Sequence, residues 1–128
     1  MFYDKNLFII SKTSFTFEQI QNKMIHQSIQ PYLPQVIELF KKHKIINAYV
    51  FGSVLTDKFN SNSDVDFLVT IQSDLDPLET GEHLWDLTYE LEDLLKRDVD
   101  LLTERSLKNP YFIQRLNETK FAIYGFGS

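Results

Sequence analysis

The chain has 128 residues and a mass of 15.1 kDa, the size of one compact domain. Its 43% hydrophobic and 14% aromatic residues, with only 4 Gly and 4 Pro, exclude a disordered or low-complexity chain. The net charge of −5 argues against direct binding of nucleic acid, because such binding needs a dominant basic face.

The sequence pattern favours a cytoplasmic protein without membrane contact. No apolar run approaches the roughly 18 residues of a membrane span, and the first residues lack the basic-then-apolar plan of a signal peptide. The chain contains 0 Cys, which excludes disulfides, thiolate metal sites and a cysteine nucleophile. Any metal would therefore be bound by oxygen or imidazole.

Charge is distributed unevenly along the chain. Residues 1–56 contain six lysines against three carboxylates, whereas residues 57–128 contain seven cations against fifteen carboxylates. A carboxylate-rich segment is usually a solvated surface, so spacing has to decide whether any of these acids has a chemical role.

The elements predicted before residue 45 are mostly helical. An apolar run at 7–10 fits either an edge strand or a docked arm. Thr16 and Gln19 have capping-box spacing, which predicts a helix to about residue 30. Two prolines then interrupt, and a second helix is expected over 34–44, with Val36, Ile37 and Phe40 facing inward and a lysine-rich end that suits the helix dipole.

The rest of the chain alternates strands and helices. We predict strands at 45–51, 65–71 and 99–102, helices from 77 to about 96 and over 104–117, and a closing extended segment at 121–124. The long helix has leucines at helical spacing, and Trp85 and Tyr89 are expected to extend its packed face. With no internal repeat or linker, the fold class is α+β: a small mixed β-sheet flanked by helices.

One stretch carries a chemical pattern: Gly52 and Ser53, ten residues, then Asp64 and Asp66. Residues i and i+2 of a strand project from the same face, so the two carboxylates point to one place. Like charges placed together are unfavourable unless a cation lies between them, and Mg²⁺ prefers carboxylate oxygens.

Two further features fit the same chemistry. Asp100 is expected to be enclosed by apolar neighbours in an otherwise buried strand, where an isolated carboxylate needs a reason. Gly52 and Ser53 come directly after a strand, where glycine allows backbone N–H groups to turn toward a phosphate and the hydroxyl adds a donor. An anion cradle beside paired carboxylates is expected where metal ions bridge a nucleoside triphosphate that a hydroxyl attacks.

On these residues, the sequence resembles the minimal MNT-type nucleotidyltransferases of the DNA polymerase β superfamily, whose motif is GS, ten residues, then DxD. The resemblance extends from about residue 24 to 125 and implies the polymerase β-like nucleotidyltransferase fold. Residues 24–128 are then the nucleotidyltransferase domain, and residues 1–23 are an N-terminal extension. Met24 is also a candidate alternative start.

The resemblance implies residue roles. Asp64, Asp66 and Asp100 would be the catalytic carboxylates that bind Mg²⁺, with Asp100 also a candidate base, and Gly52 and Ser53 would hold the triphosphate of ATP. Many relatives have an arginine and a second glycine after the serine, which this chain lacks. Lys58 is the candidate substitute.

Nearby residues have simpler interpretations. Asp98 forms a second Asp-Val-Asp copy with Asp100, but it matches no family ligand and is expected to be solvated at a helix-to-strand junction. His26, His43 and His83 share no ligand spacing and are interpreted as surface or helix-end residues.

The resemblance also implies a partner. Small MntA-type antitoxins of this family act with HepT, a helical HEPN-type ribonuclease toxin, by transferring AMP to a tyrosine. The leading hypothesis is therefore an adenylyltransferase antitoxin whose acceptor comes from another molecule. Two alternatives stay open: transfer to a small molecule such as an aminoglycoside, and a non-catalytic antitoxin that neutralises its toxin by contact through its acidic surface.

Overall fold

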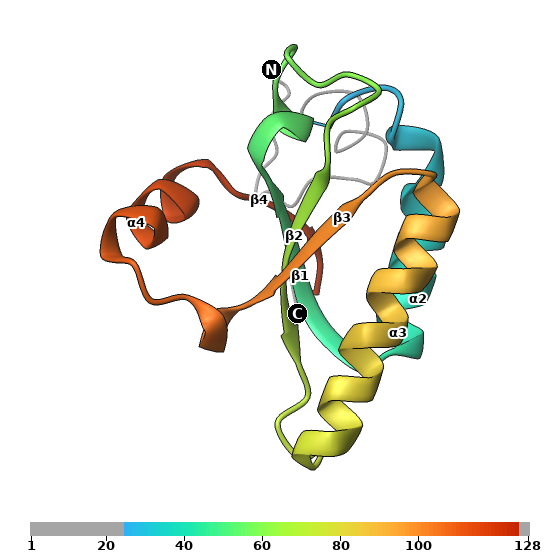
Figure 1. The fold of residues 1–128 in the computed structure, drawn as a ribbon, viewed down its shortest axis with the longest axis vertical. Helices are drawn as coiled ribbons and strands as arrows, with labels where there is room; N and C mark the ends of the chain where they lie inside the picture. Colours follow the sequence, from blue (N-terminus) through green and yellow to red (C-terminus); the bar gives the residue numbers. More distant parts are fainter. Residues whose placement is uncertain (1–24, 126–128) are drawn as a thin grey trace, which may run out of the picture.

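The computed structural model describes residues 25–125, which form a four-stranded sheet with helices on both faces (Figure 1). In chain order the elements are a 3-10 turn η1 (Gln30–Tyr32), α2 (Leu33–Lys42), β1 (Ile45–Phe51), a 3-10 turn η2 (Gly52–Leu55), β2 (Val65–Ile71), α3 (Pro77–Leu95), β3 (Val99–Thr103), a 3-10 turn η3 (Glu104–Ser106), α4 (Pro110–Thr119) and β4 (Phe121–Tyr124). This confirms the predicted α+β class.

The sheet is mixed, with the strand order β3-β2-β1-β4. β1 pairs antiparallel with β2 and with β4, whereas β2 and β3 are parallel. This topology places the end of β1 beside the starts of β2 and β3. Residues separated by almost fifty positions in the sequence therefore meet at one end of the sheet.

The main core lies between the sheet and the helices α2 and α3, which cover the same face (Figure 1). Val65, Phe67 and Val69 alternate along β2 toward this face and are completely buried. The ring of Phe40 on α2 meets that of Phe67 edge-on, with centroids 5.6 Å apart. This layer fixes which face of each strand remains for other groups.

The opposite face has a smaller apolar cluster beneath α4 (Figure 1). Its buried members are Phe51, Leu68 and Leu116. Because side chains alternate along a strand, Asp66 shares this face with Leu68. The site residues of β2 therefore lie on the α4 side of the sheet.

The predicted helix over 16–30 is wrong in its last part, and its residues up to 24, like the apolar run at 7–10, lie outside the described residues. Residues 25–29 form a turn in which His26 Nδ1 accepts a hydrogen bond from the Ser28 backbone N–H at 3.2 Å. Gln30 Nε2 donates to the Ile25 carbonyl at 2.6 Å. Such side chain to backbone bonds compete with helix formation.

The helix predicted over 104–117 also begins later than expected. Residues Glu104–Ser106 form a single 3-10 turn, and α4 starts only at Pro110. The Asn109 side chain caps it by accepting from the backbone N–H groups of Tyr111, at 2.9 Å, and Phe112, at 3.2 Å. An Asn-Pro pair is a helix-start signal, because proline suits the first helical position.

One prediction about side-chain burial is wrong. Trp85 and Tyr89 do not extend the packed face of α3 but are 71% and 67% exposed, because they lie about half a helical turn from the buried Leu87. His43 ends α2, as expected of a helix-end residue, and its side chain is only 4% exposed. Between residues 25 and 125, no helix combines the length and apolar character needed to cross a membrane.

Candidate active site

The structure brings Gly52, Asp66 and Asp100 together at one end of the sheet. In β-sheet register, Asp66 is opposite Asp100 on one side and opposite Phe51, the residue before Gly52, on the other. Asp64 lies immediately before β2, two residues from Asp66. The pattern that suggested the site in sequence thus corresponds to neighbouring positions on three adjacent strands.

The turn after β1 fits against the Asp66 carboxylate. Gly52 has a φ of +80°, in the left-handed region that glycine tolerates best. A Cβ atom at this position would overlap Asp66 Oδ2. Glycine is therefore required both by its backbone conformation and by the space left to it, and the predicted tight turn is confirmed.

The three carboxylates form one electrostatic unit. Burial, followed by the negative charges of Asp100 and Asp64, raises the pKa of Asp66 from 3.8 to about 6. The same repulsion would be relieved by a bound cation, because a positive charge favours the ionised forms. Oxygen-only donors of this kind suit a hard divalent ion such as Mg²⁺.

Asp100 differs from its prediction in one respect. β3 is an edge strand and the Asp100 side chain is exposed, so it is not enclosed in a buried strand. Within residues 25–125, no three His, Asp or Glu side chains are already arranged as metal ligands. The carboxylates have suitable chemistry for a divalent cation, and their side chains would have to turn toward it.

A pocket of about 550 Å³ lies next to the carboxylates. It is lined by Gly52, Ser53, Leu55, Thr56, Lys58, Arg115 and Thr119. Its size is typical of small-molecule sites. Two cations border it, and neither the Lys58 amine nor the Arg115 guanidinium bonds to another side chain among the described residues. The pocket therefore combines the Gly52 turn, a serine hydroxyl and two positive charges, which suits phosphate oxygens.

Arg115 could not be identified from the sequence. It lies on α4, sixty-two residues after Ser53, and the packing of Leu116 and of the Phe112 ring against Phe51 brings the two segments together. No spacing rule connects them. Helical periodicity around Leu116 would have been the sole available signal, and it indicates a face of α4 without identifying a ligand.

Arg97 is a second residue that the sequence did not reveal. Its Nη1 atom donates to the carbonyls of Asn60, at 2.9 Å, and Ser63, at 2.7 Å, and its guanidinium lies 4.4 Å from the centre of the Phe59 ring. These contacts hold the loop that leads into Asp64. Asp98 is exposed at the junction of α3 and β3, as expected.

Comparison with known proteins identifies the family. Residues 34–125, most of the chain, match the family described as polymerase beta, nucleotidyltransferase. The chain belongs to this family. The predicted polymerase β-like nucleotidyltransferase fold is thereby confirmed.

Relatives of this nucleotidyltransferase are named for protein modification. MJ0126 of Methanocaldococcus jannaschii, named as a candidate protein adenylyltransferase, is 33% identical over 81 residues, covering 63% of this chain and 79% of the relative. A crystal structure of a toxin-antitoxin with AMP-PNP matches with a TM-score of 0.58 and 27% identity, covering 73% of each chain. A Shewanella oneidensis complex of a tri-AMPylated HEPN toxin with its MNT antitoxin matches with a TM-score of 0.53 and 26% identity, covering 75% of this chain and 71% of the other.

The Gly52 turn gives a first test. Gly52→Ala should lower the free energy of unfolding by about 1–3 kcal/mol, because it adds a strained φ and an overlap with Asp66. Gly81→Ala is the matched control: Gly81 lies in α3 with nothing near its added Cβ, and the change should raise stability by about 1 kcal/mol. Urea denaturation measures both. Equal effects of the two substitutions would contradict the close approach.

Asp66 gives a second test, in metal-free protein. Its folded pKa of about 6 exceeds the unfolded value of 3.8, so the folded state holds a proton that the unfolded state has released. The contribution of Asp66 is fully present below pH 3.8 and is lost as pH rises through about 6. Denaturation of wild type and Asp66→Asn with chelator present should show wild type losing stability relative to the variant across this range. A pH-independent difference would contradict the assignment.

Proposed function

We propose that this nucleotidyltransferase transfers AMP from ATP to a tyrosine hydroxyl of a HepT-like HEPN toxin, and thereby acts as an antitoxin. The observation that carries the proposal is the Asp66 and Asp100 pair beside a pocket of about 550 Å³ that Lys58 and Arg115 border. The similarity to a toxin-antitoxin chain solved with AMP-PNP, and to an antitoxin complexed with an AMPylated HEPN toxin, supports the choice of nucleotide and partner.

The pocket provides the triphosphate site. The turn at Gly52 and the Ser53 hydroxyl supply neutral donors, while Lys58 and Arg115 offset the phosphate charge. Arginine can bind two phosphate oxygens at once, whereas lysine acts as a point charge. Arg115 thus supplies the guanidinium that many relatives place just after the serine.

The carboxylates provide the reacting end of the site. Asp64, Asp66 and Asp100 would hold Mg²⁺, which when bound neutralises phosphate charge and aligns the triphosphate for in-line attack. The tyrosine oxygen forms a bond to the α-phosphorus, the bond from that phosphorus to the bridging oxygen of the β-phosphate breaks, and pyrophosphate leaves. Asp100, exposed on the edge strand, accepts the hydroxyl proton.

Labelling of the neighbouring gene product tests the proposal. The protein, incubated with Mg²⁺, radiolabelled ATP and the protein encoded beside it, should transfer one or more AMP groups. Asp64→Asn and Asp66→Asn should each reduce labelling by at least about a hundredfold, since each removes a ligand charge while keeping shape. Asp98→Asn is the matched control, because Asp98 belongs to the other Asp-Val-Asp copy and faces solvent. Mass spectrometry of the product identifies the modified side chain.

Other outcomes would overturn the proposal. Absence of transfer with every nucleoside triphosphate would contradict the enzymatic role. Toxin neutralisation that persists at full strength in the double variant of Asp64 and Asp66 would instead support an antitoxin that acts by contact alone.

The cationic side chains give a separate prediction for the nucleotide. Arg115→Gln should raise the KM for ATP by about tenfold and change kcat less, because the lost contact is made to bound triphosphate before and during reaction. Arg105→Gln serves as control, since Arg105 is exposed on η3 and lines a different pocket. Steady-state labelling at varied ATP measures both constants. An unchanged KM in the Arg115 variant would remove this residue from the site.

A further inference from the structure

We infer that the exposed face of α3 docks a lysine- or arginine-rich segment of the acceptor protein and guides its hydroxyl to Asp100. The inference rests on the proposed function and adds the surface and the chemistry of the partner. We call the surface the α3 acidic face and define it by Glu82, Trp85, Asp86, Tyr89 and Asp93, all exposed on one helix.

The order of the strands determines the side from which the acceptor arrives. In-line displacement requires the attacking oxygen and the departing pyrophosphate to lie on opposite sides of the phosphorus. The phosphate pocket begins at Gly52, after β1, whereas Asp100 lies on β3, across β2 from it. The acceptor must therefore approach over the free edge of β3.

That edge is continuous with α3. Asp100 lines a second pocket, of about 520 Å³, together with Trp85, Thr88, Tyr89 and Glu92 of α3. Trp85 and Tyr89 are 71% and 67% exposed. Aromatic side chains with this exposure, one helical turn apart, are typical anchors of protein interfaces and bind Arg or Lys through their ring faces.

The negative charge of α3 favours a positively charged partner. The helix has six carboxylates and neither Lys nor Arg between Pro77 and Leu95. Glu90 is already engaged: its bonds to Lys42, at 2.9 Å, and to His43, at 2.7 Å, hold the pKa of Glu90 below its usual range. Glu82 and Asp86 pair with no cation among the described residues, so they are available to a basic segment.

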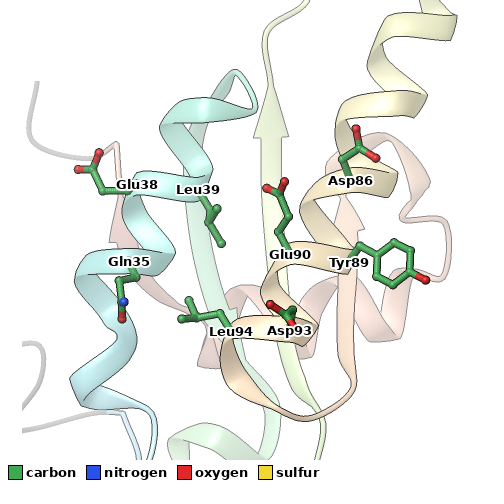
Figure 2. Close-up of a pocket in the computed structure, with 8 residues that line it drawn as sticks. All are labelled: Gln35, Glu38, Leu39, Asp86, Tyr89, Glu90, Asp93 and Leu94. Carbon is green, nitrogen blue, oxygen red and sulfur yellow. The ribbon is translucent and has the colours of Figure 1, made fainter.

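A groove extends this surface toward α2. It has a volume of about 730 Å³, and Tyr89 lines both this groove and the pocket at Asp100. Figure 2 shows Leu39 and Leu94 between the two helices, the carboxylates of Asp86, Glu90 and Asp93 along α3, and Tyr89 pointing away from α2. A basic segment can therefore lie along a continuous acidic and aromatic path that ends at the reactive carboxylate. An RNA would be repelled by the same path.

The fluorescence of Trp85 allows docking to be measured independently of catalysis, because the chain contains a single tryptophan. Two synthetic Trp-free peptides serve as probes, each with a central tyrosine, one flanked by Lys and Arg and the other by Glu. Without nucleotide, the basic peptide should shift Trp85 emission to shorter wavelength, and the acidic peptide should leave it unchanged. The affinity should fall with added salt.

Charge reversal locates the contact. The double variant Glu82→Lys and Asp86→Lys retains Trp85 and should weaken binding of the basic peptide by about tenfold or more, because two attractive pairs become repulsive. The double variant Asp74→Lys and Glu118→Lys makes the same change in net charge at exposed positions outside the α3 acidic face, one in the turn before α3 and one on α4, and should bind within about twofold of wild type. Circular dichroism confirms that both variants fold.

The outcomes separate this inference from the proposed function. Peptide binding without AMP transfer to any acceptor supports the surface while the enzymatic proposal fails. AMP transfer to the neighbouring protein that is equal in wild type and the Glu82 and Asp86 variant overturns the surface and leaves the enzyme intact. Equal weakening of peptide binding by both double variants also overturns the inferred surface. So does a shift of Trp85 emission that depends on protein concentration alone, because it would indicate that a second copy of the chain covers this face.

Discussion

The site depends on the close approach of the Gly52 backbone to the Asp66 carboxylate. Asp66 is on the central part of the sheet, with Asp100 beside it on β3 and the β1 turn on its other side. Burial and repulsion raise the pKa of Asp66 to about 6, which is unfavourable for the isolated protein. A bound cation would relieve the repulsion between the carboxylates, and an anionic ligand could then bind beside it. The site is therefore expected to be more favourable with ligands bound than empty.

The division of the sheet into two faces follows from strand alternation. One face of β2 packs against α2 and α3 through Val65, Phe67 and Val69, and this layer contains most of the buried apolar residues. The other face has only a small cluster with α4. Stability and chemistry are therefore placed on opposite sides of the same strands, and β2 can carry Asp66 without interrupting the main core.

Sequence reasoning was most successful where the signal is local. The strands at 45–51, 65–71 and 121–124 match the structure at both ends, and the third strand at all but its last residue, because β-branched runs between polar turns have few alternatives. The glycine turn followed ten residues later by paired aspartates was also found, since both parts are short patterns. Helix ends were less accurate: Asn109 and Pro110 mark the start of α4 more strongly than the hydrophobic spacing that placed it at 104.

Tertiary contacts were not predictable in the same way. Arg115 reaches the phosphate pocket through the packing of α4, and Arg97 holds the loop before Asp64 through carbonyls that have no sequence signature. The exposure of Trp85 and Tyr89 was missed for a related reason. Large aromatic residues are usually counted with the core, and only the position of α3 relative to the sheet shows that their stripe faces solvent.

The net charge of −5 conceals two opposite local environments. Lys58 and Arg115 concentrate positive charge at the pocket where an anion would bind, although the second half of the chain is strongly acidic. The carboxylates of α3 lie at the other side of this end of the sheet, where the inferred docking of a basic polypeptide would use their negative charge. The proposed transfer of a nucleotide to a basic protein needs both fields within a short distance, because the two substrates would have opposite charge and would meet from opposite sides of one phosphorus atom. In so small a fold, a four-stranded sheet separates these fields by the width of β2 and β3.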